Sequence, residues 1–289
     1  MSLAPSLRQM LPADIVRGIT HLDPLPATAG RLVAMLRGGD ESLSSIASVM
    51  EHDHALVASI LKRASAARFA GSPPRSLVEA LLRLGTVTVL DVLLDGHLRK
   101  LLTSAPAYGL GEHDLWLHGA ASQCAVRALR AERPALRVDP VADLGALLHD
   151  IGKLIVARYL KVDAGTLVAH AREQGVTYTE AERQLFGFDH TLIGAAIAEH
   201  WSFPADVAFA IRHHHDRDLA GSSPVLDAVV LANLVAKTVG TGLGAEGLNF
   251  TVDASCHRRL GLTFESFGRI CLATKEAVDA LRAFEPERR

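Results

Sequence analysis

The segment "GALLHDIGKLIV", residues 145–156, is apolar apart from an imidazole, a carboxylate and an ammonium group. These are His149, Asp150 and Lys153, and charged side chains are seldom buried without partners. His149 and Lys153 are four residues apart, so they share one face of a helix. Imidazole and carboxylate groups together suit a divalent cation. The segment is therefore the centre of a candidate metal site.

Two further segments carry metal-competent side chains on the apolar face of an expected helix. Asp114 and His118 are four residues apart in "EHDLWLHGAASQCA" and face the same way. His190 opens the helix that follows Asp189. The positive end of a helix disfavours imidazolium, so we expect His190 to be neutral, the form that binds metals.

The last candidates lie towards the end of the same half of the chain. In "ADVAFAIRHHHD" the apolar stripe includes His214 and His215, whereas His213 points elsewhere. In "VLDAVVLANLVAK", Asn233 lines up with the apolar positions. Both segments add nitrogen or oxygen donors to a face that should be buried.

Each of these residues, taken alone, has an ordinary structural explanation, such as a hydrogen-bonded core histidine or a helix cap. As a set they would be several buried polar groups, each of which costs stability. One shared cation would remove that cost. Nitrogen and oxygen donors without thiolate favour iron or manganese over structural zinc, with zinc, magnesium and nickel left open. The number of donors allows two ions.

The elements that must position these side chains are helices. Apolar residues recur at helical spacing along nearly the whole chain, and no alternating run is long enough for a sheet. Asp40, Asp53 and Ser76 are expected helix N-caps. The fold class is therefore all-α.

The best internal boundary is the Gly-, Pro- and Ser-rich stretch at residues 103–114. We expect two helical lobes, with most of the unusual histidines in the second. The predicted parts are an N-terminal tail or first helix (1–18), an N-terminal helical lobe (19–105), a metal-site lobe (106–240), and a loop and C-terminal helix packing on that lobe (241–289).

Composition limits the class of protein. Hydrophobic residues make up 49% of the chain and aromatic residues only 5%, which favours helices packed through aliphatic side chains. A net charge of −2 and the absence of a basic run argue against nucleic acid as a partner. The three scattered cysteines suit reduced thiols, and no segment looks like a signal peptide or membrane span. These features predict a cytoplasmic protein.

Several segments together resemble the HDOD family, the HD-related output domains of bacterial signalling proteins. "SLVEALLRLGTVTVLDVLL" resembles its N-terminal helices, and "DLGALLHDIGKLIV", "FGFDHTLIGAAIAEHWSFP" and "AIRHHHD" resemble its HD-type half. The resemblance covers most of the chain. It implies an all-α, two-lobed fold in which an N-terminal helical lobe packs on an HD-like bundle.

The related HD-GYP phosphodiesterases, which cleave cyclic dinucleotides, use a fuller set of metal ligands. The last aspartate of the HD pattern is replaced here by Asn233, which removes a negative charge and weakens divalent-cation binding. The GYP segment is replaced by "DRDLAGSSP". Carried across position by position, the ligands of that branch fall on Asp114 (a Glu there), His118, His149, Asp150, His190, His214 and His215, and its phosphate-facing lysine falls on Lys153.

The resemblance implies two functions of different classes. The first is a signalling module whose core binds divalent metal, or a nucleotide, and which acts through a separate protein partner. The second is a metal-dependent phosphohydrolase acting on a nucleotide or cyclic dinucleotide. In that enzyme Asp150 would hold the metal and the nucleophilic water, and Lys153 would neutralise phosphate charge. Bound metal without hydrolysis of any phosphoester would indicate the signalling module. The sequence leaves the choice between the two functions open.

Overall fold

The structure is all-helical, as the sequence predicts, with no strand in the part of the chain that is described and one isolated β-bridge between Ala105 and Leu110. No helix within these residues is both long enough and apolar enough to cross a bilayer. The computed structural model describes residues 9–22, 25–36, 42–51, 53–65, 73–102, 105, 108–111, 113–159, 164–216, 219, 223–242, 244 and 254–283.

Some of the helices begin where a short polar side chain accepts a hydrogen bond from a free backbone amide. Asp53 accepts a hydrogen bond from the Leu56 amide and Ser76 accepts one from the Glu79 amide, so both predicted N-caps are confirmed. Asp40 lies outside the described residues, and the cap of the helix in that region is Ser42.

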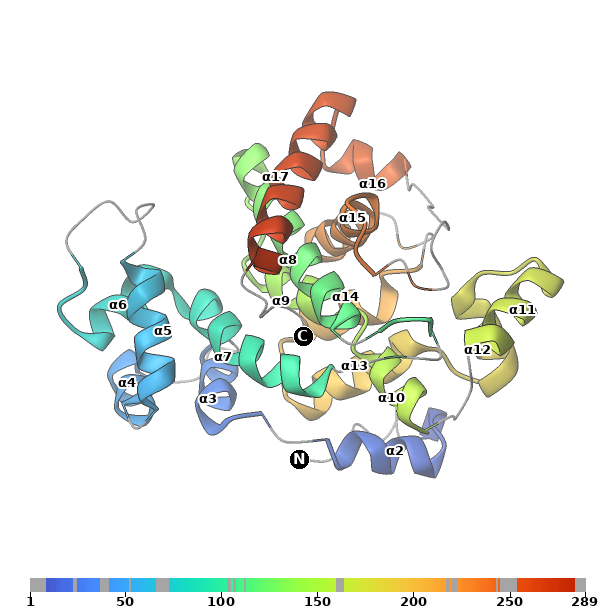
Figure 1. Cartoon of the computed structure of the whole chain (residues 1–289), viewed down its shortest axis with the longest axis horizontal. Helices are drawn as coiled ribbons and strands as arrows, with labels where there is room; N and C mark the ends of the chain where they lie inside the picture. Colours follow the sequence, from blue (N-terminus) through green and yellow to red (C-terminus); the bar gives the residue numbers. More distant parts are fainter. Residues whose placement is uncertain are drawn as a thin grey trace. The chain divides into compact units, whose positions relative to one another are not determined.

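The chain forms two compact units, which are described separately. The smaller unit comprises Asp23–Leu101 and Trp201–Pro204. Helix α3 packs on α4 and α7, and α5 packs on α6 and α7 (Figure 1). Its helices are α3 (Ala27–Leu36), α4 (Leu43–Met50), α5 (His54–Ala64), α6 (Leu77–Leu84) and α7 (Thr86–Leu101).

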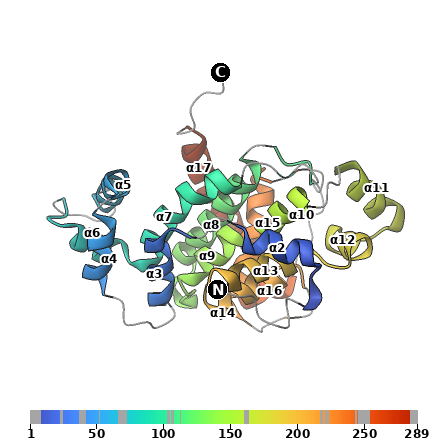
Figure 2. The ribbon, with the colours of Figure 1, turned by 90° about the horizontal axis from the view of Figure 1, so that it is seen from below.

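The larger unit is built around α8, which is buried on all sides along most of its length. Helices α9, α15 and α17 pack against α8, and α13 packs against α10, α14 and α2 (Figures 1 and 2). The helices of this unit are α2 (Ala13–Thr20), α8 (Asp114–Glu132), the 3-10 turn η3 (Pro134–Leu136), α9 (Val141–Leu148), α10 (Gly152–Tyr159), α11 (Ala164–Gln174), α12 (Tyr178–Phe186), α13 (His190–His200), α14 (Ala205–His213), α15 (Pro224–Thr238), α16 (Ala254–Arg259) and α17 (Phe264–Ala283).

Two short segments fall outside the division expected from the sequence. Residues 19–22, which the sequence placed in the N-terminal lobe, cluster with the larger unit together with the rest of α2, because the apolar face of α2 packs on α10 and α13. Trp201–Pro204 clusters with the smaller unit, where the Trp201 and His97 rings pack in a T-shaped arrangement at a centroid distance of 6.3 Å. Composition marks loops, but it does not show which unit a short segment packs on.

Candidate metal centre

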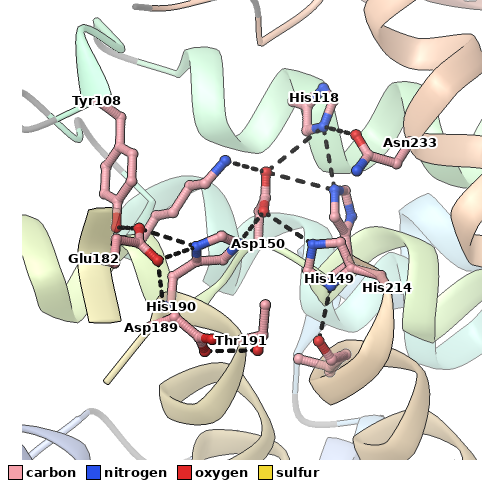
Figure 3. Close-up of polar contacts among 12 residues, drawn as sticks. Tyr108, His118, His149, Asp150, Glu182, Asp189, His190, Thr191, His214 and Asn233 are labelled. Atoms are coloured by element: carbon pink, nitrogen blue, oxygen red, sulfur yellow. Dashed lines mark hydrogen bonds and ion pairs between the residues drawn. The ribbon is translucent and has the colours of Figure 1, made fainter. Parts of the chain in front are cut away.

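Six side chains of the larger unit converge into two overlapping groups that could each hold a cation. Within each group the donor atoms all lie within 4.8 Å of one another. Asp150 belongs to both groups and lies between the histidine rings (Figure 3). We name the groups by their members: group A is Asp150, His190, His214 and His215, and group B is His118, His149 and Asp150.

Helix ends and one helix interior bring these side chains together. His149 and Asp150 lie in the break between α9 and α10, His190 is the first residue of α13, and His214 and His215 directly follow α14. His118 projects from the second turn of α8. Side chains at helix ends can turn towards a common point because the backbone there is free of the helical pattern.

Close backbone approach sets the spacing between these elements. A Cβ atom on Gly119 of α8 would lie 2.3 Å from the Leu147 carbonyl oxygen of α9, and one on Gly152 of α10 would lie 1.9 Å from the His190 carbonyl oxygen of α13. Any larger residue at either position would separate the helices that carry the candidate ligands. Glycine is therefore required here for proximity.

The two carboxylate oxygens of Asp150 face different groups. Oδ1 faces group A and Oδ2 faces group B, where it also accepts a hydrogen bond from Lys153 (Figure 3). A carboxylate in this position could bridge two ions. The distances are 3.3 Å from Oδ1 to His190 Nε2, 3.6 Å from Oδ1 to His214 Nε2, 3.5 Å from Oδ2 to His149 Nε2, 3.7 Å from Oδ2 to His118 Nε2 and 2.9 Å from Oδ2 to Lys153 Nζ.

Backbone carbonyls fix the tautomers of three histidines. In each ring Nδ1 lies close enough to a carbonyl oxygen to donate a hydrogen bond, so in the neutral ring Nε2 is an acceptor that points into the cluster. Binding of Nδ1 to a carbonyl is the usual arrangement for a metal-ligating histidine. The pairs are His118 with Thr241 at 3.1 Å, His149 with Ala146 at 2.8 Å and His214 with Ile211 at 2.8 Å.

As a result, several hydrogen-bond acceptors in the cluster face one another. His118 Nε2 lies 3.2 Å from His149 Nε2 and 3.2 Å from Asn233 Oδ1. Two neutral imidazole acceptors at this distance repel, and a cation between them would replace the repulsion with two bonds. In group A four buried atoms have no hydrogen-bond partner among the described residues: Asp150 Oδ1, His190 Nε2, His214 Nε2 and His215 Nε2.

The residues present therefore fit a divalent metal. Buried polar atoms without partners are costly, and these converge on the places where a cation would satisfy them. Nitrogen and oxygen donors with no thiolate suit a first-row ion such as iron or manganese.

Burial keeps most of the imidazoles in their metal-binding form. It lowers the pKa of His118 from 6.5 to about 4, against the opposing attraction of Asp150. Burial also lowers the pKa of His149, His214 and His215. Although burial opposes its charge, the Lys153 ammonium and the neighbouring histidines hold the pKa of Asp150 well below its usual range, so Asp150 is ionised.

His190 departs from the sequence-based expectation of a neutral ring. Burial favours neutrality, but the Glu182 carboxylate and Asp150 outweigh it and raise the pKa of His190 to about 9. Glu182 Oε2 lies 2.8 Å from His190 Nδ1 and also accepts the His190 backbone amide at 2.9 Å. The attraction of a buried carboxylate in contact with the ring has a larger effect on the pKa of His190 than the positive end of the helix has. A metal ion that binds His190 would therefore displace a proton.

These pKa shifts predict how the stability of the metal-free protein depends on pH. Between pH 6.5 and about pH 4, His118 is protonated in the unfolded chain but stays neutral in the folded protein, because burial lowers its pKa. The free energy of unfolding therefore falls as the pH drops through that range. Folded His190 keeps its proton up to about pH 9, so its stabilising contribution is present below pH 6.5 and is lost as the pH rises through 9. Thermal melts in chelator should therefore show maximal stability near pH 6.5.

Glu182→Gln is the matched variant for this prediction. Without the Glu182 charge the alkaline decline should flatten, while the acid decline persists. An unchanged alkaline decline in the variant would show that Glu182 does not hold the proton of His190.

The structure brings together most, but not all, of the residues predicted from the sequence. His118, His149, Asp150, His190, His214 and His215 form groups A and B, Asn233 contacts His118, and Lys153 contacts Asp150. Asp114 is the exception, because it is in neither group and its Oδ2 accepts the Gly111 amide at 2.8 Å. As the first residue of α8 it stabilises the turn that precedes the helix, and its role as a metal ligand stays a prediction.

Sequence reasoning missed three residues that hold the ligands in place. Glu182 binds His190 and Tyr108 binds Glu182 (Figure 3). The Thr241 carbonyl binds His118. Glu182 is a fully buried carboxylate on α12, and its eight-residue distance from His190 gives no helical signal across the intervening turn. A backbone carbonyl such as that of Thr241 has no sequence signal at all.

Comparison with known proteins gives the same family as the sequence. A family model described as HDOD domain matches residues 22–217. An uncharacterized protein of Treponema pallidum (strain Nichols) is 26% identical over 240 residues, which cover 78% of this chain and 44% of that protein. The chain thus spans less than half the length of this curated relative.

Solved structures show the same fold at low identity. A Geobacter sulfurreducens HDOD domain protein of unknown function has a TM-score of 0.62 and 21% identity, over 96% of this chain and 93% of that one. A candidate signal transduction protein from Marinobacter aquaeolei VT8 has a TM-score of 0.65 and 22% identity, over 96% and 63% of the two chains. A candidate metal-dependent phosphohydrolase from Shewanella amazonensis SB2B has a TM-score of 0.53 and 20% identity, over 94% and 100%. With a family match over more than half its length, the chain belongs to the HDOD domain family.

Proposed function

We propose that this chain is a signal-transduction module whose HD-type centre holds divalent metal and which acts through a separate protein partner. The observation that carries the metal is the convergence of histidine Nε2 atoms on the Asp150 carboxylate, where four buried atoms of group A have no hydrogen-bond partner among the described residues and His118 Nε2 faces His149 Nε2. Family membership and the name of the Marinobacter neighbour support signalling. Three free cysteines support a reducing compartment, the cytoplasm.

Burial of the centre favours binding over turnover. Asp150 is 5% exposed and Lys153 is 3% exposed, and Lys153 is already engaged with Asp150. A phosphoester would have to reach side chains that are almost completely buried. A module that senses or stores metal needs no such access.

A metal-dependent phosphohydrolase is the second candidate, and the position of Lys153 favours it. Its ammonium lies 2.9 Å from Asp150 Oδ2, beside both ligand groups, where it could also neutralise a phosphate. Bound ions would supply polarisation of the phosphoryl oxygens and an activated water. The name of the Shewanella neighbour supports this alternative, for a nucleotide or cyclic dinucleotide substrate.

Metal analysis followed by a phosphoester panel separates the two functions. The full chain is purified without chelator, its metal content is measured, and nucleotides and cyclic dinucleotides are assayed with added Mn²⁺ or Fe²⁺. We expect bound metal without hydrolysis. Hydrolysis that His149→Ala abolishes would establish the enzyme instead, and a chain that retains no ion would contradict both functions.

Asn233→Asp tests the departure from the usual HD ligand pattern. Asn233 Oδ1 lies 3.2 Å from His118 Nε2, so a carboxylate here would add a negative charge to group B. We expect Mn²⁺ to bind roughly tenfold more tightly, because hard divalent cations gain from added carboxylate charge. If the enzyme alternative holds, hydrolysis should rise as well.

Without metal, Asn233→Asp should destabilise the protein, whereas with Mn²⁺ it should strengthen binding. Asn233 is 7% exposed, so an unneutralised aspartate there should lower the melting temperature in chelator. Addition of Mn²⁺ should raise the melting temperature more than it does in the wild type. Equal Mn²⁺ affinity in variant and wild type would place Asn233 outside the ligand shell.

A further inference from the structure

Tyr108 is buried beside the metal centre in a short turn that precedes α8. The turn is closed by backbone hydrogen bonds between Ala105 and Leu110, and Tyr108 itself is 1% exposed. Its ring lies 5.3 Å from Lys153 Nζ, measured to the ring centroid, and its hydroxyl donates a hydrogen bond to Glu182 Oε1 (Figure 3). The ring is therefore held at its face by a cation and at its tip by a carboxylate.

Glu182 connects Tyr108 to a candidate ligand. This carboxylate has no exposed surface and accepts three hydrogen bonds, from the Tyr108 hydroxyl, the His190 backbone amide and His190 Nδ1. The two contacts with His190 fix both the start of α13 and the rotation of the imidazole. The opposite ring nitrogen, Nε2, faces Asp150 Oδ1 at 3.3 Å.

We propose that Tyr108 and Glu182 are positioning residues for His190, which orient its Nε2 for the ion held by group A. This inference rests on the proposed metal-binding function and extends it to residues that do not touch the ion. A carboxylate on the distal nitrogen of a ligating histidine holds the ring orientation and increases its basicity. The Tyr108 hydroxyl holds that carboxylate in turn, because without it Glu182 would be positioned by its contacts with His190 alone.

The structure assigns a different dependence to group B. His118 and His149 are oriented by backbone carbonyls of Thr241 and Ala146, not by Glu182. Loss of the Tyr108 hydroxyl should therefore weaken the ion of group A and leave the ion of group B in place. This asymmetry distinguishes positioning from a general loss of folding.

The test measures Mn²⁺ affinity of the full chain by chelator competition, with Co²⁺ absorption as a spectroscopic report of ligand geometry. Tyr108→Phe keeps the ring over Lys153 and removes only the hydroxyl, and Glu182→Gln keeps the side-chain volume. Each should weaken one Mn²⁺ site by about 10- to 100-fold, the range seen for partners of metal ligands, and change the Co²⁺ spectrum. Tyr178→Phe, at the other buried tyrosine that the structure describes in this unit, should bind as the wild type does.

A His190→Ala background shows whether the two residues act through His190. There, Tyr108→Phe and Glu182→Gln should cause no further loss of Mn²⁺ affinity, because the ligand they orient is gone. If His190→Ala does not fold, the double variant of Tyr108 and Glu182 replaces it, and its loss should be smaller than the product of the single losses. Additive losses would overturn the inference.

Failure of the inference is distinguishable from failure of the proposed function. A wild-type chain that binds no Mn²⁺ would overturn both. Wild-type binding that Tyr108→Phe and Glu182→Gln leave unchanged would overturn only the positioning role. Loss of both ions together in Tyr108→Phe would also overturn it, since the hydroxyl would then support the fold and not one ligand.

Discussion

Replacement of Asp150 by Asn is expected to abolish metal retention at both ligand groups. Asp150 is the only residue that groups A and B share, and it supplies the only carboxylate in either group. Without its charge, the remaining donors are neutral imidazoles and an amide, which bind a divalent cation far more weakly. We expect the affinity for Mn²⁺ to fall by at least about 100-fold, more than for substitution of any single histidine, so that the protein retains almost no metal after purification.

The variant should also destabilise the protein through Lys153. The ammonium is 3% exposed and its bond to Asp150 Oδ2 would lose its charged partner. Removal of one member of a buried pair costs about 3–5 kcal/mol when the other stays charged. Chemical unfolding should register this cost in the presence of chelator, where metal makes no contribution.

Asp143→Asn is the matched control. Asp143 is also a buried aspartate, but it pairs with Arg127 and Arg130 and belongs to neither ligand group. Its substitution should lower stability and leave metal content intact. An Asp150→Asn protein that still carried a full complement of metal would refute the shared-ligand arrangement.

Gly152→Ala is expected to cause a large loss of stability in the larger unit. A Cβ on Gly152 would lie 1.9 Å from the His190 carbonyl oxygen and 2.8 Å from the Gly194 amide nitrogen, and both obstacles are backbone atoms. Backbone cannot rotate away as a side chain can, so α10 and α13 must separate. Such overpacking costs about 3 kcal/mol or more, and it would also displace Asp150 from His190 and weaken metal binding.

Gly268→Ala supplies the control for the intrinsic effect of this substitution. Gly268 lies within α17, and a Cβ there would meet no atom within 4 Å. Alanine should stabilise this helix by roughly 0.5–1 kcal/mol, the usual helix preference over glycine. Urea unfolding of the two variants should therefore move in opposite directions, and a Gly152→Ala protein as stable as the wild type would disprove the close contact of α10 with α13.

Local sequence carried most of the fold. Asp53 and Ser76 begin helices because a side-chain oxygen can reach a free amide three residues on, and that geometry depends on neighbours in the chain alone. The placement of Trp201–Pro204 with the smaller unit was not foreseeable in this way. Packing against residues about a hundred positions earlier decided it, and no local pattern reports such a contact.

Among the candidate ligands, too, some features were predictable from the sequence and others depended on tertiary packing. His118, His149, Asp150, His190, His214 and His215 could be selected from the sequence because polar groups on apolar helix faces need a common partner. Asp114 satisfied the same spacing rule, yet it bonds to Gly111 at the helix start. The spacing of residues shows which face of a helix a side chain occupies, but it does not show at which position along the helix the site lies.

The protonation state of the centre and its supporting shell depended on tertiary structure alone. The helix end predicted a neutral His190, whereas contact with Glu182 from another helix raises its pKa to about 9. The roles of Tyr108, Glu182 and the Thr241 carbonyl likewise arise from segments that meet only when the helices pack. Helical periodicity and side-chain chemistry are properties of the chain and can be read from it, while electrostatic fields and hydrogen-bond partners depend on distances that exist only after folding.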